Sequence, residues 1–251
     1  MILCLTYHKI VSAESDDDHD FYSVTADDLA HQIQATLAAG YTALTFDELK
    51  SARNIEGKKF FITFDDGTED HHRIVLPLLK KLRQHAVFFV PTAKLNRPGY
   101  LTDAQTAELS AAGQIVGCHS HEHRRLDTLS PDEIKGQLEI SCQTLRRLTG
   151  QAPWIFAPPG GFITPQIQAT AKDFGLQIIR TMRWGFNRRP DFTALETAPL
   201  NRHTTRSKFQ KILQGRQPRL LYLGKQAIKA IIPLRAYESV RSWMFRLGRK
   251  Q

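Results

Sequence analysis

Residues 59–67 read Lys-Phe-Phe-Ile-Thr-Phe-Asp-Asp-Gly, an apolar run that ends in two carboxylates and a glycine. The aromatic and β-branched residues predict a buried strand. Asp65 and Asp66 repel each other at the end of this strand unless a cation lies nearby, and Gly67 allows the chain to turn sharply there. One carboxylate is then suited to bind a metal ion while the other takes a proton from water. A solvated acidic pair, or a cap for the following helix, is the alternative.

Strands of this kind alternate with helices along most of the chain. We expect strands at residues 2–7, 41–45, 59–64, 86–90, 115–118, 154–157, 176–182 and 198–203. We expect helices at residues 25–39, 72–84, 102–112, 130–148 and 164–174. This alternation predicts an α/β fold with a parallel sheet. The polar and Gly/Pro-rich clusters follow the strands, at the carboxyl ends where the active sites of such sheets gather.

A second cluster of candidate ligands is His119-Ser-His121-Glu-His123, directly after the expected strand at 115–118. Imidazole is the commonest metal ligand at neutral pH. His119 and His123 share a face if the segment forms a helical turn, and His119 and His121 share one if it stays extended. One aspartate and two histidines, with open positions for water, make a catalytic coordination set. A surface or core role for each histidine is the alternative.

Composition limits the class of protein. The 251 residues are 41% hydrophobic and 24% charged, which is typical of a soluble globular domain. The formal net charge of +9 favours acidic partners such as nucleic acid, anionic lipid or an acidic glycan, or else a solvated basic surface. Cys4, Cys118 and Cys142 are odd in number and form no CxxC pair, so we expect a reducing compartment. We find no signal peptide and no membrane-spanning run, and we expect a cytoplasmic protein.

The two clusters together resemble a known family. TFDDG at residues 63–67, followed by HSxxH at residues 119–123, resembles the polysaccharide deacetylases of the NodB-homology type, carbohydrate esterase family 4. LTYHKI at residues 5–10 is similar to the N-terminal strand of many members. The resemblance runs from residue 2 to residue 203. It implies an irregular (β/α)7-type barrel and a metal-dependent hydrolase that removes N-acetyl groups from a glycan or a lipid-linked saccharide, in polysaccharide biosynthesis or modification.

The resemblance also assigns roles to residues of this chain. Asp65 matches the catalytic base, and Asp66, His119 and His123 match the metal ligands. The cation, with Zn²⁺ as the first expectation, polarises the amide carbonyl and lowers the pKa of water. Co²⁺, Ni²⁺ and Mn²⁺ accept the same ligand set. His121 has no role in the family pattern and is a candidate for contacting the metal ligands without binding the metal itself.

The third motif of the family departs from its usual form here. The sequence reads Ala157-Pro-Pro159-Gly160-Gly, with alanine in the place of the arginine that orients the base in the family. We expect Pro159 and Gly160 to contact substrate. Orientation of Asp65 must then come from elsewhere, and Arg180, Arg183 and Arg202 are candidates that the sequence does not rank.

The fourth and fifth motifs also differ. Trp184 is present without the neighbouring aspartate of the fourth motif, and we expect it to wall the acetyl pocket or stack on a sugar, with a core role as the alternative. The fifth motif supplies the general acid, and His203 lies one place later than its usual spacing from Leu200. His8, at the end of the first strand, is the rival for the pocket, and Arg202 is a further candidate for its surroundings.

Residues 207–251 differ in composition from residues 1–206, which we take as the barrel domain. Lys, Arg and apolar residues dominate this tail, and Glu238 is its only acid. We expect basic amphipathic helices with breaks near Gly215 and Pro233. Either they pack on the barrel with a solvated basic face, or Trp243 and Phe245 help them to attach to the inner face of a membrane.

Other functions remain open from the sequence. One is a related C–N hydrolase on a small amide; an amidohydrolase would use His119 and His121, but that pair belongs on a first barrel strand and here follows about the fourth. A catalytically dead carbohydrate-binding or scaffold protein is suggested by the altered third and fourth motifs. A nucleic-acid binder rests on charge alone, and because aromatic residues do not interleave with the basic ones, we expect no nucleic-acid partner.

Overall fold

The computed structural model describes residues 1–12, 20–52 and 55–215. Residues 1–210 form one compact unit and residues 211–251 a second one. The strands and all the predicted site residues belong to the first unit. Most of the predicted basic tail, from residue 216 on, lies outside the described residues.

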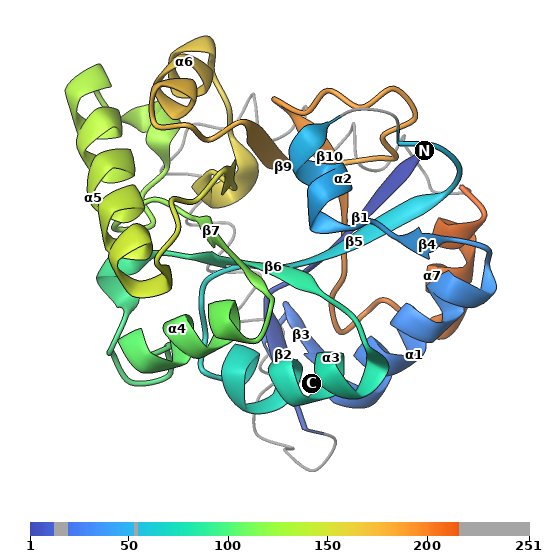
Figure 1. Cartoon of the computed structure of the whole chain (residues 1–251). Helices are drawn as coiled ribbons and strands as arrows, with labels where there is room; N and C mark the ends of the chain where they lie inside the picture. The colour runs from blue at the N-terminus through green and yellow to red at the C-terminus, as the bar shows by residue number, and fades with distance from the viewer. Residues whose placement is uncertain (13–19, 53–54, 216–251) are drawn as a thin grey trace, which may run out of the picture. The chain divides into compact units, whose positions relative to one another are not determined.

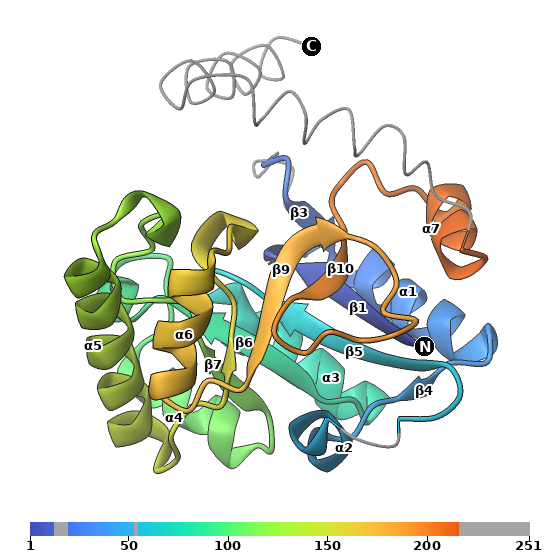
Figure 2. The same ribbon diagram turned by 90° about the horizontal axis from the view of Figure 1, so that it is seen from above.

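Seven parallel strands close into a barrel. Around the barrel they are β1 (Ile2–Tyr7), β5 (Lys59–Phe64), β6 (Ala86–Val90), β7 (Ile115–Cys118), β8 (Ile155–Phe156), β9 (Ile178–Trp184) and β10 (Leu195–Pro199). The ring closes because β1 pairs with both β5 and β10. It is irregular, since β8 has two residues and the register shifts between β9 and β10. The predicted (β/α)7-type barrel is confirmed (Figures 1 and 2).

Three short strands lie outside the ring. β4 (Thr42–Ala43) pairs with the start of β5, and β2 (Lys9–Val11) pairs with β3 (Ser23–Thr25) in a separate two-stranded sheet. The β2–β3 pair was not predicted, because three-residue strands give no periodic signal. It lies directly beyond the carboxyl end of β1, and this places the chain around residues 20–25 near that end of the barrel.

Helices surround the strands (Figure 1). They are α1 (Ala26–Ala38), α2 (Phe46–Ser51), α3 (Leu76–Leu82), α4 (Asp103–Ala111), α5 (Pro131–Thr149), α6 (Pro165–Asp173) and α7 (Arg206–Leu213). Short 3₁₀ turns are η2 (Thr92–Lys94), η3 (Leu126–Thr128) and η4 (Pro159–Gly161), and η1 (His71–Val75) is a π-helix. Serine or threonine hydroxyls cap the first turns of α1, α2, α4, α5 and α6.

Two sequence expectations differ from the structure. The helix expected at 72–84 is split into η1 and α3. The last strand lies at Leu195–Pro199 and not at 198–203. Thr204 donates its backbone N–H to the carbonyl of Asn201 over 2.8 Å, so residues 201–204 turn away from the sheet. His203 therefore lies on a turn beyond the barrel strand.

The barrel interior carries a polar layer below the carboxyl ends of its strands. The hydroxyls of Thr6 and Thr63 lie 2.8 Å apart, and Thr197 is hydrogen-bonded to Thr6. All three side chains are buried and each has a partner, as buried hydroxyls require. Because side chains alternate along a strand, His8 and Asp65 follow Thr6 and Thr63 on the same interior face. Strand pairing thus brings these two residues together.

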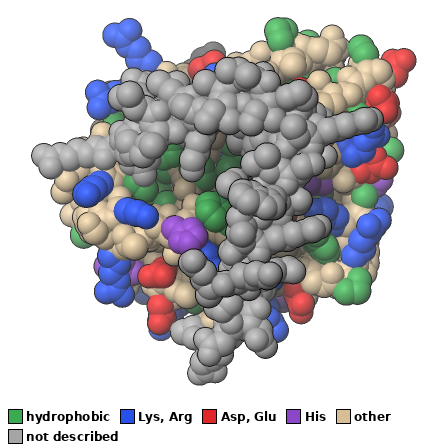
Figure 3. Space-filling model, turned by 180° about the vertical axis from the view of Figure 1, so that it is seen from behind, with side chains coloured by type: hydrophobic (Ala, Val, Ile, Leu, Met, Phe, Trp, Pro, Cys, Tyr) green, Lys and Arg blue, Asp and Glu red, His purple; other side chains and the backbone are tan. Residues whose placement is uncertain are grey.

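The described residues contain no helix long and apolar enough to cross a membrane. On the face seen in Figure 3, the described Lys and Arg side chains are spread among Asp and Glu side chains. Both signs of charge therefore occur on the visible part of this face.

Gly117 of β7 is closely packed against its neighbours. A Cβ atom there would lie 2.7 Å from Cδ1 of Phe89 and 3.2 Å from Cγ2 of Ile155. We expect Gly117→Ala to lower the free energy of unfolding by about 1–3 kcal/mol, because the buried ring has no room to move. Chemical denaturation followed by circular dichroism measures this change.

Gly136 in the interior of α5 is the matched control. A Cβ atom there meets nothing within 4 Å. We expect Gly136→Ala to raise the free energy of unfolding by roughly 0.5–1 kcal/mol, since alanine is the better helix former. Equal effects of the two substitutions contradict the packing account.

Candidate metal centre and active site

A sharp turn after β5 separates the two adjacent aspartates. Asp65 still donates its backbone N–H to the Tyr7 carbonyl over 2.9 Å, so it keeps the strand geometry. Asp66 and Gly67 have φ values of 74° and 61°, in the left-handed region. A Cβ atom on Gly67 would lie 3.2 Å from Cγ1 of Val90. The turn leaves Asp65 facing the barrel interior, and it directs Asp66 to a different set of neighbours.

Those neighbours are the two histidines at the end of β7. The Oδ1 atom of Asp66 lies 2.8 Å from Nε2 of His123 and 3.5 Å from Nε2 of His119. Ser120 and His123 have φ values of 61° and 63°, so the segment is neither a regular strand nor a helical turn. This irregular loop brings the first and last histidines of the cluster together, with ring centroids 4.8 Å apart.

The three side chains suit a divalent cation. One ligand atom from each of Asp66, His119 and His123 can be chosen so that all lie within 4.8 Å of one another. Nδ1 of His119 donates to the carbonyl of Ala157 over 2.5 Å, and this leaves the Nε2 lone pair for a metal. Carboxylate and imidazole together fit Zn²⁺ and its neighbours in the first transition row. The predicted ligand set is thus assembled in one place.

The charges in the cluster favour ligation as well. Burial raises the pKa of Asp66, but hydrogen bonds from His119 and His123 outweigh it and hold that pKa well below its usual range. Burial lowers the pKa of His123. An ionised carboxylate and a neutral imidazole are the forms that bind metal.

Asp65 lies beside this cluster in a separate environment. It is 2% exposed, and its Oδ1 atom accepts a hydrogen bond from the guanidinium of Arg180. Burial raises the pKa of Asp65, but Arg180 and then His8 lower it, and the net shift is downward. Asp65 therefore stays ionised in the interior of the barrel, as a base must.

Of the three candidate arginines, Arg180 is the one that contacts Asp65, in a chain that lacks the third-motif arginine. It comes from β9, the strand next to β8, where Ala157 replaces that arginine. Its side chain is fully buried, with the guanidinium 4.9 Å from the centre of the Phe89 ring. The other candidates lie elsewhere: Arg183 donates to the carbonyl of Ala194, and Arg202 is exposed.

A signal for Arg180 is present in the sequence. The residue stands in an apolar strand, Ile-Ile-Arg-Thr-Met, and a charged group in such a strand needs a buried partner. Asp65 at the end of another strand is a partner of the right sign. Only the barrel closure shows that the two strands face the same interior.

His8 reaches the same carboxylate from the other side. Its Nε2 atom lies 3.7 Å from Oδ2 of Asp65, and its ring stacks on Tyr22 with centroids 4.6 Å apart. Burial lowers the pKa of His8, and the nearby aspartates oppose this shift. The π-helix η1 holds its backbone, since Nε2 of His71 lies 2.6 Å from the carbonyl of His8. Among the described residues, Nδ1 of His8 is buried without a hydrogen-bond partner.

The remaining predicted residues lie around this centre. Nδ1 of His121 lies 2.9 Å from the hydroxyl of Thr92, so its ring contacts η2, the turn after β6. Pro159 and Gly160 form η4 after β8, and Gly160 has a φ of 72°. Trp184 is half-buried at the end of β9, where it meets Phe186 edge-on.

His203, the predicted general acid, is exposed on its turn. Its ring centroid lies 5.6 Å from that of Phe21. Within the described ranges, the side chains of Arg180 and His8 lie against the carboxylate of Asp65. His8, the rival candidate, therefore lies next to Asp65, whereas His203 lies next to Phe21.

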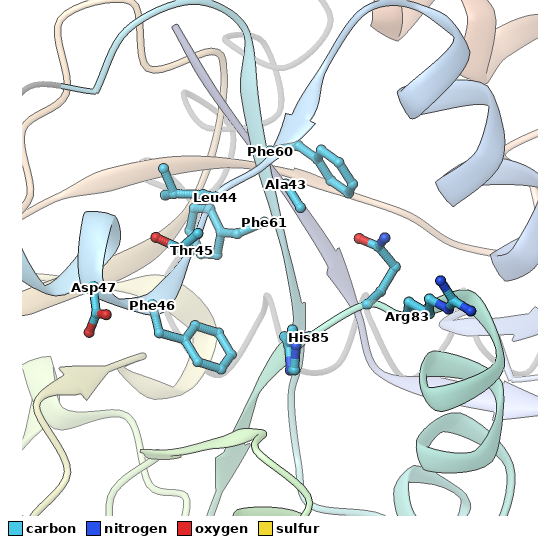
Figure 4. Close-up of a pocket in the computed structure, with 10 residues that line it drawn as sticks. Ala43, Leu44, Thr45, Phe46, Asp47, Phe60, Phe61, Arg83 and His85 are labelled. Carbon is cyan, nitrogen blue, oxygen red and sulfur yellow. The ribbon is translucent and has the colours of Figure 1, made fainter.

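A cavity of about 400 Å³ lies at the opposite, amino end of the strands (Figure 4). It is lined by Ala43, Leu44, Thr45, Phe46, Asp47, Phe60, Phe61, Arg83, Gln84 and His85. None of the predicted site residues lines it. The candidate active site thus depends on the side-chain cluster at the carboxyl ends, where barrel enzymes carry out their chemistry.

Comparison with known proteins agrees with this geometry. Chitin deacetylase 1 of Saccharomyces cerevisiae is 31% identical over 150 residues, which cover 58% of this chain and 48% of that protein. The peptidoglycan-N-acetylglucosamine deacetylase of Bacillus cereus is 28% identical over 130 residues, 51% of this chain and 57% of that one. The chain spans about half the length of the curated relatives it matches.

Solved structures share the fold. The deacetylase PplD of Streptococcus pyogenes, in complex with acetate, superposes with a TM-score of 0.75 at 23% identity and covers 86% of this chain and 98% of its own. A family model described as polysaccharide deacetylase matches residues 52–179, just over half of the chain. This match contains Asp65, Asp66, His119 and His123. The chain belongs to the polysaccharide deacetylase family.

Proposed function

We propose that this protein is a metal-dependent hydrolase that removes N-acetyl groups from a polymer of amino sugars. The observation that carries the proposal is the convergence of Asp66, His119 and His123 on one point, beside the buried carboxylate of Asp65. The names of the relatives, which include chitin and peptidoglycan-N-acetylglucosamine deacetylases, support an N-acetylated glycan as the substrate.

The chain supplies each part that amide hydrolysis needs. Asp66, His119 and His123 would hold the cation, which acts when bound as a Lewis acid that polarises the amide carbonyl and makes water more acidic. Asp65 accepts the proton of the attacking water. Arg180 keeps Asp65 ionised and fixes its orientation, because its guanidinium contacts one carboxylate oxygen from the barrel interior.

The amine that leaves must also gain a proton. We infer that His8 supplies it, since His8 lies 3.7 Å from Asp65 and has only 15% of its side chain exposed. A proton donor close to Asp65 can reach the leaving amine within the same active site. His203 stays the alternative that the family pattern suggests.

The proposed function is tested by acetate release from N-acetylglucosamine oligomers. We expect release by the full chain, and its loss on treatment with a chelator or on Asp66→Ala substitution, because the ligand set is then broken. Asp65→Asn should retain metal, measured by elemental analysis, and lose about 10²–10⁴-fold in kcat.

The matched control is Asp132→Asn, which changes an exposed carboxylate in the first turn of α5. It should leave acetate release unchanged. Metal-independent release, or near-full activity of Asp65→Asn, contradicts the proposal.

The Asp65–Arg180 pair has a consequence for stability. We expect Arg180→Met to lower the free energy of unfolding by about 3–5 kcal/mol at neutral pH, because a buried carboxylate loses its cation. Since burial without Arg180 raises the pKa of Asp65, the deficit should shrink as the pH falls and Asp65 becomes protonated. Unfolding by denaturant at several pH values measures this trend.

The double variant Arg180→Met with Asp65→Asn is the control for this ion pair. It should recover most of the lost stability, because no uncompensated charge remains in the barrel. A double variant as unstable as Arg180→Met alone contradicts an ion pair between these residues.

The identity of the proton donor is tested by a pair of substitutions. We expect His8→Asn to lower kcat by about 10²-fold, and His203→Asn to lower it less. Steady-state kinetics on the same oligomer gives both values. His85→Asn, at the amino end of the barrel, is the control and should leave kcat unchanged. The opposite order of losses assigns the acid to His203.

A further inference from the structure

A row of aromatic rings leads outward from the catalytic centre. The ring of His8 stacks on Tyr22 at a centroid distance of 4.6 Å. Tyr22 meets Phe21 edge-on at 5.1 Å, and Phe21 lies 5.6 Å from the ring of His203. Because His8 also contacts Asp65, the row connects the proposed base with an exposed histidine.

Three separate segments build this row, and all lie at the carboxyl end of the barrel. His8 follows β1, Phe21 and Tyr22 precede β3, and His203 follows β10. β1 and β10 are hydrogen-bonded neighbours, and Leu200 extends their pairing by donating to the carbonyl of Thr6 over 2.8 Å. The row is therefore held by the strands that position Asp65.

Exposure increases along the row. The side chain of His8 is 15% exposed, whereas Phe21 is 38% exposed and His203 is also exposed. The other large exposed apolar residues of the described chain are aliphatic and lie on helices: Leu37 on α1 and Ile140 on α5. An exposed phenyl ring at the end of the barrel that carries the catalytic cluster is thus a distinctive feature.

The chemistry of the row suits a sugar ring. A pyranose has a face of C–H groups that packs on an aromatic ring, and hydroxyl groups at its edge that need hydrogen-bonding partners. Phe21 offers the apolar surface, while the imidazole of His203 offers polar atoms beside it.

We propose that Phe21, Tyr22 and His203 form a platform for the sugar residue next to the one that is deacetylated. This inference rests on the proposed function, which places the reacting acetamide at Asp65 and the metal ligands. The enzyme then acts on chains of at least two sugar residues in preference to the monosaccharide. The platform gives His203 a role in binding.

Kinetics on two substrates tests the platform. With chitotetraose, we expect Phe21→Ala to raise KM by about tenfold while kcat changes little, because one aromatic ring is removed from binding and the reacting groups remain. The preference for chitotetraose over N-acetylglucosamine, measured as a ratio of kcat/KM values, should fall by the same factor. Phe21→Trp should keep the wild-type preference and Phe21→Leu should not.

Ile140→Ala is the matched control, since it removes an apolar side chain of comparable exposure from α5. It should leave KM for chitotetraose unchanged. Thermal melts of each variant check the fold, and the recovery expected for Phe21→Trp separates stacking from local unfolding. An unchanged preference in a folded Phe21→Ala variant overturns the platform.

A binding measurement separates this proposal from the proposed function. Titration calorimetry of chitotetraose into the Asp65→Asn chain should detect binding that weakens about tenfold when Phe21→Ala is added. If this holds while the wild-type chain releases no acetate, the platform stands and the deacetylase assignment fails. If the Asp65→Asn chain does not bind chitotetraose, or binds it equally well with Phe21→Ala, the platform is overturned.

Discussion

The contact between Asp65 and Arg180 is the constraint on which the rest of the site depends. Two opposite charges lie in the interior of the barrel, and each compensates the other there. Barrel closure makes the contact possible, since β5 and β9 are not neighbours and meet only across the interior. The ion pair keeps the carboxylate of Asp65 ionised, fixes its orientation and holds it apart from the metal ligands.

The left-handed backbone at Asp66 gives the side chains of Asp65 and Asp66 different surroundings. Without that turn, neighbouring side chains would point to opposite faces of the strand. With it, Asp65 faces an arginine and a histidine, whereas Asp66 faces two histidines. Adjacent carboxylates thus obtain different partners from their surroundings, and a base and a metal ligand can occupy consecutive positions.

Some parts of this site can be predicted from the sequence and others cannot, for physical reasons. The strands and the turn at Asp65 follow from apolar runs that end in polar clusters, whereas the assignment of Asp66, His119 and His123 as metal ligands comes from the resemblance to the family. Which two of the three histidines converge depends on backbone φ values that no periodicity reveals. Arg180 could be named but not ranked, because its partner lies 115 residues earlier and only the ring of strands brings them together.

Arg180 also changes how the altered third motif should be weighed. An alanine at position 157 is an argument for a catalytically inactive site only if no other position can bring a positively charged side chain to Asp65. β8 and β9 are adjacent strands, and a long arginine side chain from either one can reach the interior. The proposed role of Asp65 requires a buried guanidinium against its carboxylate, not an arginine at one place in the chain. Because the described barrel meets that requirement from β9, the missing arginine no longer distinguishes a scaffold from a hydrolase.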